Sequence, residues 1–144
     1  MAFFYADSSV LVKRHLVEPG TLWMQALADP AARNRILTAH ITHVEGMSAL
    51  NRRRREGTLD IAQYASIADD LVALCATEYQ VVALSPAIVD RCRQLLEAYP
   101  LRAYDAVQLA TAVLSNQALI AGGHPPLTFL AADRRLRDST VVFW

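Results

Sequence analysis

This chain of 144 residues has few cysteines, a single lysine and no formal net charge. Its two cysteines, Cys75 and Cys92, fall inside helical apolar patterns, so we expect buried reduced thiols rather than a disulfide or a catalytic pair. Lys13 is the only lysine, and 14 basic residues balance 14 acidic ones to a formal net charge of +0. A domain that binds nucleic acid through its overall charge is strongly basic, so any contact with phosphate must be local.

Long apolar runs are also missing. No basic lead with a long apolar stretch opens the chain, and the most apolar later segment, residues 109–122, is interrupted by Ser115, Asn116 and Gln117. We therefore expect a cytoplasmic protein without a membrane span. The composition, 53% hydrophobic and 19% charged, is that of a globular chain, and no repeat or linker divides it. We expect a single domain over residues 1–144.

The chain does have a regular alternation of short β-type runs with longer helical patterns. Parallel strands need a crossover of a dozen residues or more, so this alternation predicts an α/β three-layer sandwich with a parallel sheet of four to five strands and helices on both faces. Strands are expected at Phe3–Ala6, Arg35–Ala39, Val81–Leu84, Leu127–Ala131 and, as a fifth, Thr140–Phe143. Helices are expected at Ser8–His15, Leu22–Ala28, Thr42–Glu56, Asp60–Glu78, Ser85–Ala98 and Asp105–Leu119.

Aspartates follow directly on two of the expected strands. Asp7 comes after the first strand, and Asp133 comes after the fourth, in the run FLAADRRL. Ligands bind outside the carboxyl ends of the strands in open parallel sheets, so both carboxylates are expected in one crevice if these strands are neighbours. Glu45 and Asp105, near the starts of two expected helices, are placed to join them.

Four carboxylates in one crevice repel each other and raise each other's pKa unless a positive charge lies between them. A divalent cation supplies that charge. Oxygen ligands favour a hard ion such as Mg²⁺, which takes one or two carboxylates together with waters and phosphate oxygens of a substrate. Such a site binds phosphate without a basic protein around it, which agrees with the net charge of +0.

Each acid also has a purely structural interpretation. Glu45 stands three residues after Thr42, which is the spacing of a capping box. Asp105 is a good helix cap by itself, and Asp7 or Asp133 fits a turn. All four fall where the crevice of an α/β sheet is expected, and this coincidence favours a shared site.

These patterns, in this order, resemble the PIN-domain ribonucleases and more narrowly the VapC toxins of bacterial VapBC toxin–antitoxin pairs. No single part is specific, but the set covers the chain nearly end to end. The matching parts are the opening strand with Asp7, Ser9 and SVLVK, Glu45 ahead of SAL, the run RAYDAVQLATA with Arg102 and Asp105, and the late ADRRL with Asp133.

The resemblance implies an endoribonuclease toxin that depends on Mg²⁺ or Mn²⁺ and hydrolyses RNA phosphodiester bonds with a metal-activated water. It implies that Ser9 shapes the metal shell and that Arg102 lies close to it. One or two ions are both compatible with the pattern. By the same resemblance, metal binding and catalysis belong to Asp7, Glu45, Asp105 and Asp133.

The resemblance also implies a homodimer and a VapB-like antitoxin that binds as a helix in a groove of the early helices. The apolar stripe of Leu22, Trp23, Ala26 and Leu27 is either core or part of that groove, and Trp23 is the residue to test.

Basic residues near the acids are candidate contacts to the RNA substrate. Arg52, Arg53 and Lys13 are the candidates to meet phosphate. The run Arg52–Arg55 also ends a helix, where positive charge suits the helix dipole, and this favours a solvated helix end over RNA contact. A surface helix explains Lys13 equally well.

Two other functions stay open at this point. A phosphatase of the haloacid dehalogenase type also has an aspartate after its first strand, but it has a second aspartate two positions later, where this chain has Ser9. The second alternative is a degenerate PIN-like module that binds RNA or protein without cutting it. The presence of all four acids counts against this alternative. The 28 positions from Asp105 to Asp133 (133 − 105) are long for the pattern, so Asp138 is a possible substitute.

Overall fold

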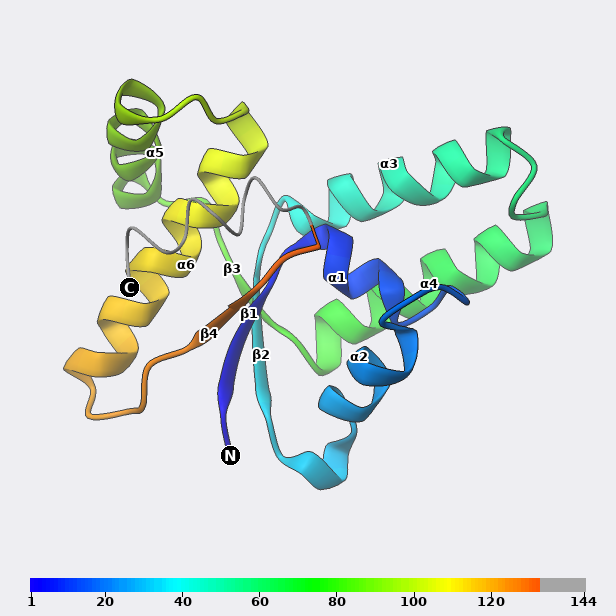
Figure 1. The fold of residues 1–144 in the computed structure, drawn as a ribbon, viewed down its shortest axis with the longest axis horizontal. Coiled ribbons are helices and arrows are strands. Elements are labelled where there is room, and N and C mark those ends of the chain that lie inside the picture. Colours follow the sequence, from blue (N-terminus) through cyan, green and yellow to red (C-terminus); the bar gives the residue numbers. More distant parts are fainter. Residues whose placement is uncertain (133–144) are drawn as a thin grey trace.

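The computed structural model describes residues 1–132, and within them a four-stranded parallel sheet lies between two layers of helices (Figure 1). The strand order is β3-β2-β1-β4, and every neighbouring pair is parallel. The predicted α/β sandwich is therefore confirmed, while the expected fifth strand at Thr140–Phe143 lies outside the described residues. The strands are β1 (Phe3–Ala6), β2 (Arg35–Ala39), β3 (Gln80–Val82) and β4 (Thr128–Leu130).

The helices divide between the two faces of the sheet (Figure 1). The first four helices pack on one face, and the last two pack on the other. No helix within residues 1–132 is long and apolar enough to cross a membrane. The helices are α1 (Ser8–Lys13), α2 (Thr21–Leu27), α3 (Thr42–Arg55), α4 (Ile61–Thr77), α5 (Pro86–Ala98) and α6 (Ala103–Ala121), with a short 3-10 helix, η1 (Pro30–Ala32), after α2.

Strand β1 is apolar on both faces because helices cover both. Successive side chains of a strand point to opposite faces. Phe4 accordingly packs against the core under α1 to α4, whereas Phe3 and Tyr5 pack in the core under α6. Cys75 and Cys92 are free and buried in opposite layers, as predicted.

The parallel topology brings several chain segments to one edge of the sheet. Helix α1 begins two positions after β1 ends (8 − 6), and α3 begins three positions after β2 ends (42 − 39). The starts of α1 and α3 lie side by side at the upper end of the strands in Figure 1. Any polar side chain in these first turns is therefore presented at the carboxyl edge of the sheet.

Candidate active site

Asp7 is the first residue after β1, and its side chain is buried at 5% exposure. It is the N-cap of α1, because its Oδ1 accepts a hydrogen bond from the Val10 amide at 3.2 Å. The Ser9 hydroxyl donates to the same oxygen at 2.6 Å. The position thus combines a structural role with a carboxylate at the predicted edge of the sheet.

Burial raises the pKa of Asp7 to about 6, although hydrogen bonds from Ser9 and Val10 act to lower it. The negative charge of Glu45 raises it further. A helix cap alone does not require a carboxylate to be buried in this way. Strongly raised pKa values cluster at functional sites, so this one supports the interpretation of Asp7 as a site residue.

Ser9 connects Asp7 to the chain after β4. Its hydroxyl donates to Asp7 and accepts a hydrogen bond from the Ala132 amide at 3.0 Å. Asp133 is the next residue in the sequence, and it lies outside the described residues together with its possible substitute Asp138. The expected fourth acid therefore stays a prediction.

Glu45 lies in the first turn of α3, half-buried, and it does not form the capping box that its spacing allows. Ile41 occupies the cap position with no side-chain hydrogen bond, and the Thr42 hydroxyl contacts the Thr38 hydroxyl at 2.7 Å. Instead, Glu45 Oε1 accepts a hydrogen bond from Gln108 Nε2 at 2.6 Å. Burial raises the pKa of Glu45, and the charge of Asp105 adds to the rise.

Asp105 lies in the first turn of α6 and is not its cap. The helix begins two positions earlier than predicted, at Ala103, and Arg102 occupies the cap position without a side-chain hydrogen bond there. Asp105 is half-buried, and its charge acts on Glu45, whose charge acts in turn on Asp7. Glu45 therefore interacts electrostatically with both Asp7 and Asp105.

Within residues 1–132, no three His, Cys, Asp or Glu side chains converge as a ready metal-binding group. The chemistry of the donors nevertheless fits a hard divalent ion, because the coupled groups are all carboxylates. Mg²⁺ takes one or two carboxylates and completes its shell with waters and substrate oxygens, so it does not need three convergent acids. Asp7, Glu45 and Asp105 are the described residues that could hold it.

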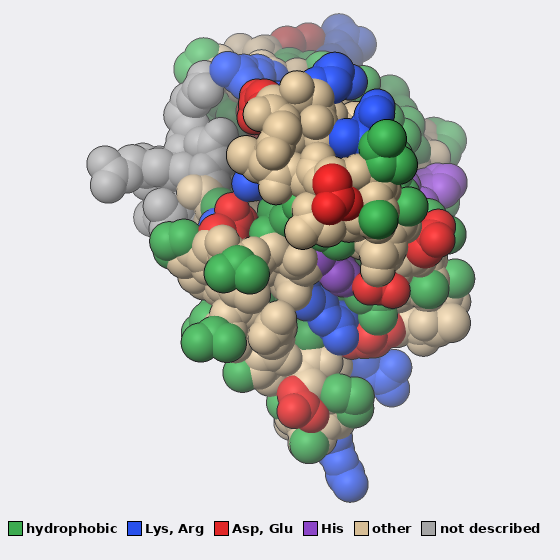
Figure 2. Space-filling model, turned by 90° about the vertical axis from the view of Figure 1, so that its right-hand side faces the viewer, with side chains coloured by type: hydrophobic (Ala, Val, Ile, Leu, Met, Phe, Trp, Pro, Cys, Tyr) green, Lys and Arg blue, Asp and Glu red, His purple; other side chains and the backbone are tan. Residues whose placement is uncertain are grey.

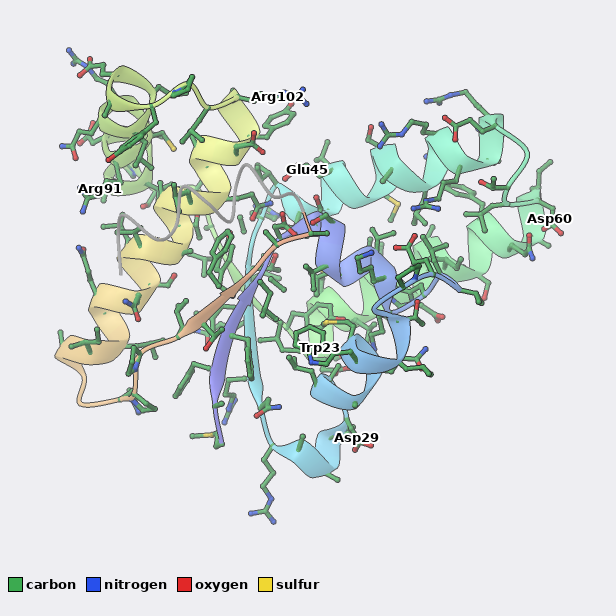
Figure 3. The ribbon with its side chains drawn as sticks, in the orientation of Figure 1. Trp23, Asp29, Glu45, Asp60, Arg91 and Arg102 are labelled. Atoms are coloured by element: carbon green, nitrogen blue, oxygen red, sulfur yellow. The ribbon has the colours of Figure 1, made fainter. Side chains whose placement is uncertain are left out.

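A cleft of about 680 Å³ opens beside Glu45, and Ser9 is also part of its wall, whereas Asp7 and Asp105 are not. Arg102 and Tyr104, at the start of α6, line it as well. In Figure 3, Glu45 on α3 and Arg102 at the start of α6 lie near the same end of the sheet. The resemblance to PIN-domain ribonucleases implied that Arg102 lies close to the acids.

Basic side chains line the same cleft along α3. Arg52 and Arg53 belong to its wall, as does Lys13 of α1. Arg52 stands seven positions after Glu45 (52 − 45), which is about 10 Å along a helix at 1.5 Å per residue. On the face in Figure 2, Lys and Arg side chains gather at the top, where α3 ends in Figure 1.

An acidic residue, Glu18, holds two of these basic side chains together. Its Oε1 lies 3.2 Å from Lys13 Nζ and its Oε2 lies 3.0 Å from Arg53 Nη2. Arg54, by contrast, lies over the ring of Tyr64 on α4. The basic end of α3 is therefore not uniformly solvated, since part of it lines the cleft and part packs on the protein.

Comparison with known proteins places this geometry in a family. Residues 4–137 match the family model of the PIN domain. The chain belongs to the PIN domain family. Membership of this family excludes the alternative of a phosphatase of the haloacid dehalogenase type. A search of the curated proteins found no match.

Among solved structures, this PIN domain is similar to the toxin VapC20 of Mycobacterium tuberculosis, which is described as cleaving the sarcin-ricin loop. The TM-score is 0.61, and the likeness covers 98% of this chain and 96% of that one. The two sequences are 14% identical, so the likeness establishes the shared fold.

The apolar stripe on α2 of the PIN domain is split between core and surface. Met24 and Leu27 are buried, whereas Leu22 is 82% and Trp23 is 55% exposed. Of the predicted stripe, only Leu27 therefore belongs to the core. A separate groove of about 810 Å³, lined in part by Leu16 and by residues of α4, lies on the same layer of the PIN domain, but Trp23 is not in its wall.

The polar residues that surround Glu45 were not predicted from the sequence. Gln108, at 1% exposure, hydrogen-bonds Glu45, and the Ser8 hydroxyl acts to lower the pKa of the same carboxyl group. The available signal was a glutamine inside the apolar helix pattern of RAYDAVQLATA. A buried polar side chain needs partners, so such a glutamine indicates a hydrogen-bond network in the fold.

Proposed function

We propose that this PIN domain is an endoribonuclease that depends on Mg²⁺ or Mn²⁺ and acts as the toxin of a type II toxin–antitoxin pair. Membership of the PIN family supports a nuclease in general, and the similar structure VapC20 is itself described as an RNA-loop-cleaving toxin. The observation that carries the proposal is the cleft in which Glu45 and the basic side chains of α1 and α3 share one wall.

The proposed metal ligands are the four acids, Asp7, Glu45, Asp105 and Asp133. A divalent ion supplies charge that favours the hydroxide form of a bound water and stabilises negative charge on the phosphate. Ser9 holds the Asp7 carboxylate through Oδ1, which limits the positions that the second oxygen can take. Burial raises the pKa of Asp7 to about 6 and raises the pKa of Glu45 as well, so metal binding is expected to release protons as the pH falls toward 6.

The proposed RNA path follows the cleft from the acids toward the end of α3. Lys13, Arg52 and Arg53 are the expected phosphate contacts, and Arg102 is the expected contact nearest the acids. Tyr104, at 57% exposure, offers a ring on which an unpaired base can stack. Both kinds of contact are typical of a groove for single-stranded nucleic acid.

Cleavage of RNA by the purified chain, with and without Mn²⁺, tests the activity against the variant Asp7→Asn. Asparagine keeps the size and the cap oxygen of Asp7 but removes its charge. Loss of partners of metal ligands costs about 10–100-fold in activity, so loss of a ligand is expected to cost at least roughly 100-fold.

The matched control for that experiment is Asp29→Asn. Asp29 is also an N-cap, since it accepts a hydrogen bond from the Ala31 amide at 2.7 Å. It lies at the opposite end of the sheet from Glu45 in Figure 3, and this control is expected to cleave like the wild type. Equal cleavage by Asp7→Asn and the wild type would end the assignment. Absence of Mn²⁺ binding by the wild type would favour the degenerate binding module instead.

The toxin proposal includes an antitoxin helix on the layer that carries Trp23, and a homodimer of the chain. An exposed tryptophan is a frequent anchor of a protein interface. The variant Trp23→Ala is expected to weaken binding of a VapB-like antitoxin by about 10-fold or more, as measured by calorimetry. Leu96→Ala, at a half-exposed position on α5 in the other layer, is the control and should bind normally. Unchanged affinity of a folded Trp23→Ala would remove Trp23 from the interface.

A further inference from the structure

Gln108 contacts β1, which ends next to Asp7, and α3, which carries Glu45. It lies on α6, three positions after Asp105 (108 − 105), and is 1% exposed. Its Oε1 accepts a hydrogen bond from the Tyr5 hydroxyl at 2.6 Å. Its Nε2 donates to Thr42 Oγ1 at 3.0 Å and to Glu45 Oε1 at 2.6 Å. One amide thus joins α6, β1 and α3.

The orientation of this amide follows from counting protons. Thr38 Oγ1 donates to the Ala6 carbonyl at 2.7 Å, so its single proton is used there. The proton in the 2.7 Å contact between Thr38 and Thr42 then comes from Thr42. Thr42 Oγ1 must therefore accept from Gln108, which requires that Nε2 faces Thr42.

The same bonds form a buried chain that begins and ends on β1, close to Asp7. It starts at Tyr5, passes through Gln108 and two threonines, and ends at the carbonyl of Ala6, the residue before Asp7. Tyr5, Thr38 and Thr42 are all 0% exposed. Buried networks in which each partner is satisfied hold their side chains in one arrangement.

We propose that Gln108 is a positioning residue that fixes the Glu45 carboxylate relative to Asp7 and Asp105, so that the acids can share a divalent ion. This inference rests on the proposed function. Gln108 itself contacts neither RNA nor the ion in this proposal. It acts through Glu45, as hydrogen-bond partners of metal ligands do in other metal sites.

Two variants of the chain isolate the positioning role. Gln108→Met keeps the length of the side chain and removes both amide contacts. Tyr5→Phe removes the donor to Gln108, together with the hydroxyl's interactions with Thr111 and the Ala39 backbone, and keeps the ring that stacks on Phe129 at 5.4 Å. It tests the same chain of bonds if Gln108→Met does not fold.

The matched control is Asn116→Leu on the same helix. Asn116 is also a buried amide, at 9% exposure, and its Oδ1 accepts a hydrogen bond from the Leu127 amide at 3.0 Å. Its loss is expected to destabilise the fold without touching the acids. It therefore separates a general loss of stability from a loss of positioning.

Calorimetric titration with Mn²⁺ in the absence of RNA is the main measurement, and kcat and KM for RNA cleavage are the second. Gln108→Met is expected to weaken Mn²⁺ binding about 10–100-fold and to lower kcat with little change in KM. Tyr5→Phe is expected to show a smaller loss of the same kind, and the double variant to be no worse than Gln108→Met. Asn116→Leu is expected to lower the melting temperature but to bind Mn²⁺ like the wild type.

The outcomes separate this inference from the function on which it rests. Wild-type Mn²⁺ affinity in a folded Gln108→Met, or in Tyr5→Phe where Gln108→Met does not fold, would overturn the positioning role and leave the nuclease proposal intact. An equal loss of affinity in Asn116→Leu would overturn it as well. A wild-type chain that neither binds Mn²⁺ nor cleaves RNA would overturn both.

Discussion

At the scale of the residue, Asp7 destabilises the fold when it is ionised. Its pKa is raised from 3.8 in the unfolded chain to about 6 in the folded one. Between these values the folded protein binds more protons than the unfolded chain, so the free energy of unfolding falls as pH rises from about 4 to 6. At 1.36 kcal/mol per unit, the loss above pH 6 is on the order of 2–3 kcal/mol.

The variant Asp7→Asn is therefore expected to be more stable than the wild type at pH 7.5, by about 2 kcal/mol. The difference should shrink toward zero near pH 4, because Asp7 is protonated in both states below that pH. Urea unfolding at both pH values measures it. Asp29→Asn, at an exposed cap, is the control for replacing a capping aspartate by asparagine. A wild type as stable as Asp7→Asn at pH 7.5 would contradict the raised pKa.

At the scale of the element, each of the three described acids lies at the start of a helix. Asp7 caps α1, while Glu45 and Asp105 each lie in the first turn of a helix. Carboxylates near a helix N-terminus are stabilised by about 0.3–1 kcal/mol each. The positive ends of the helix dipoles therefore partly offset the electrostatic repulsion among these carboxylates at one edge of the sheet.

Helix α4 illustrates a cap with no link to the site. Asp60 Oδ1 accepts from the Gln63 amide at 2.7 Å, and the Gln63 side chain accepts from the Asp60 amide at 2.9 Å. Asp60→Ala is expected to lower the free energy of unfolding by about 1 kcal/mol, measured by urea denaturation. Asp69→Ala, exposed in the middle of the same helix, should change it far less. Equal effects would mean that the capping box contributes little.

At the scale of the whole molecule, the net charge of +0 conceals a local basic wall of the cleft. Removing one basic side chain that binds phosphate is expected to flatten the slope of log affinity against log salt by about 0.7 for single strands. Arg52→Gln and Arg53→Gln should each show this change in binding of single-stranded RNA. Arg91→Gln, on α5 at the far side of the molecule in Figure 3, should keep the wild-type slope. Unchanged slopes in both α3 variants would favour the solvated helix end.

Short-range patterns in the sequence determined the elements and the family. Alternating strand and helix runs predicted the parallel sheet, because residue periodicity reflects which faces are buried. They also placed Asp7 at the end of β1, since a polar residue marks where a buried strand stops. Local signals misled where tertiary contacts competed, as at Glu45, whose capping-box spacing is overruled by the hydrogen bond from Gln108.

Only the tertiary structure decided which distant residues act together. The Tyr5 contact to Gln108 spans 103 positions, and the Gln108 contact to Glu45 spans 63. No local pattern encodes such pairs, because they depend on how α6 packs against the sheet. The same holds for Glu18 between Lys13 and Arg53, and for the exposure of Trp23. The sequence by itself therefore determined the strands, the helices and the acids, while the packing of helices on both faces of one sheet determined their neighbours.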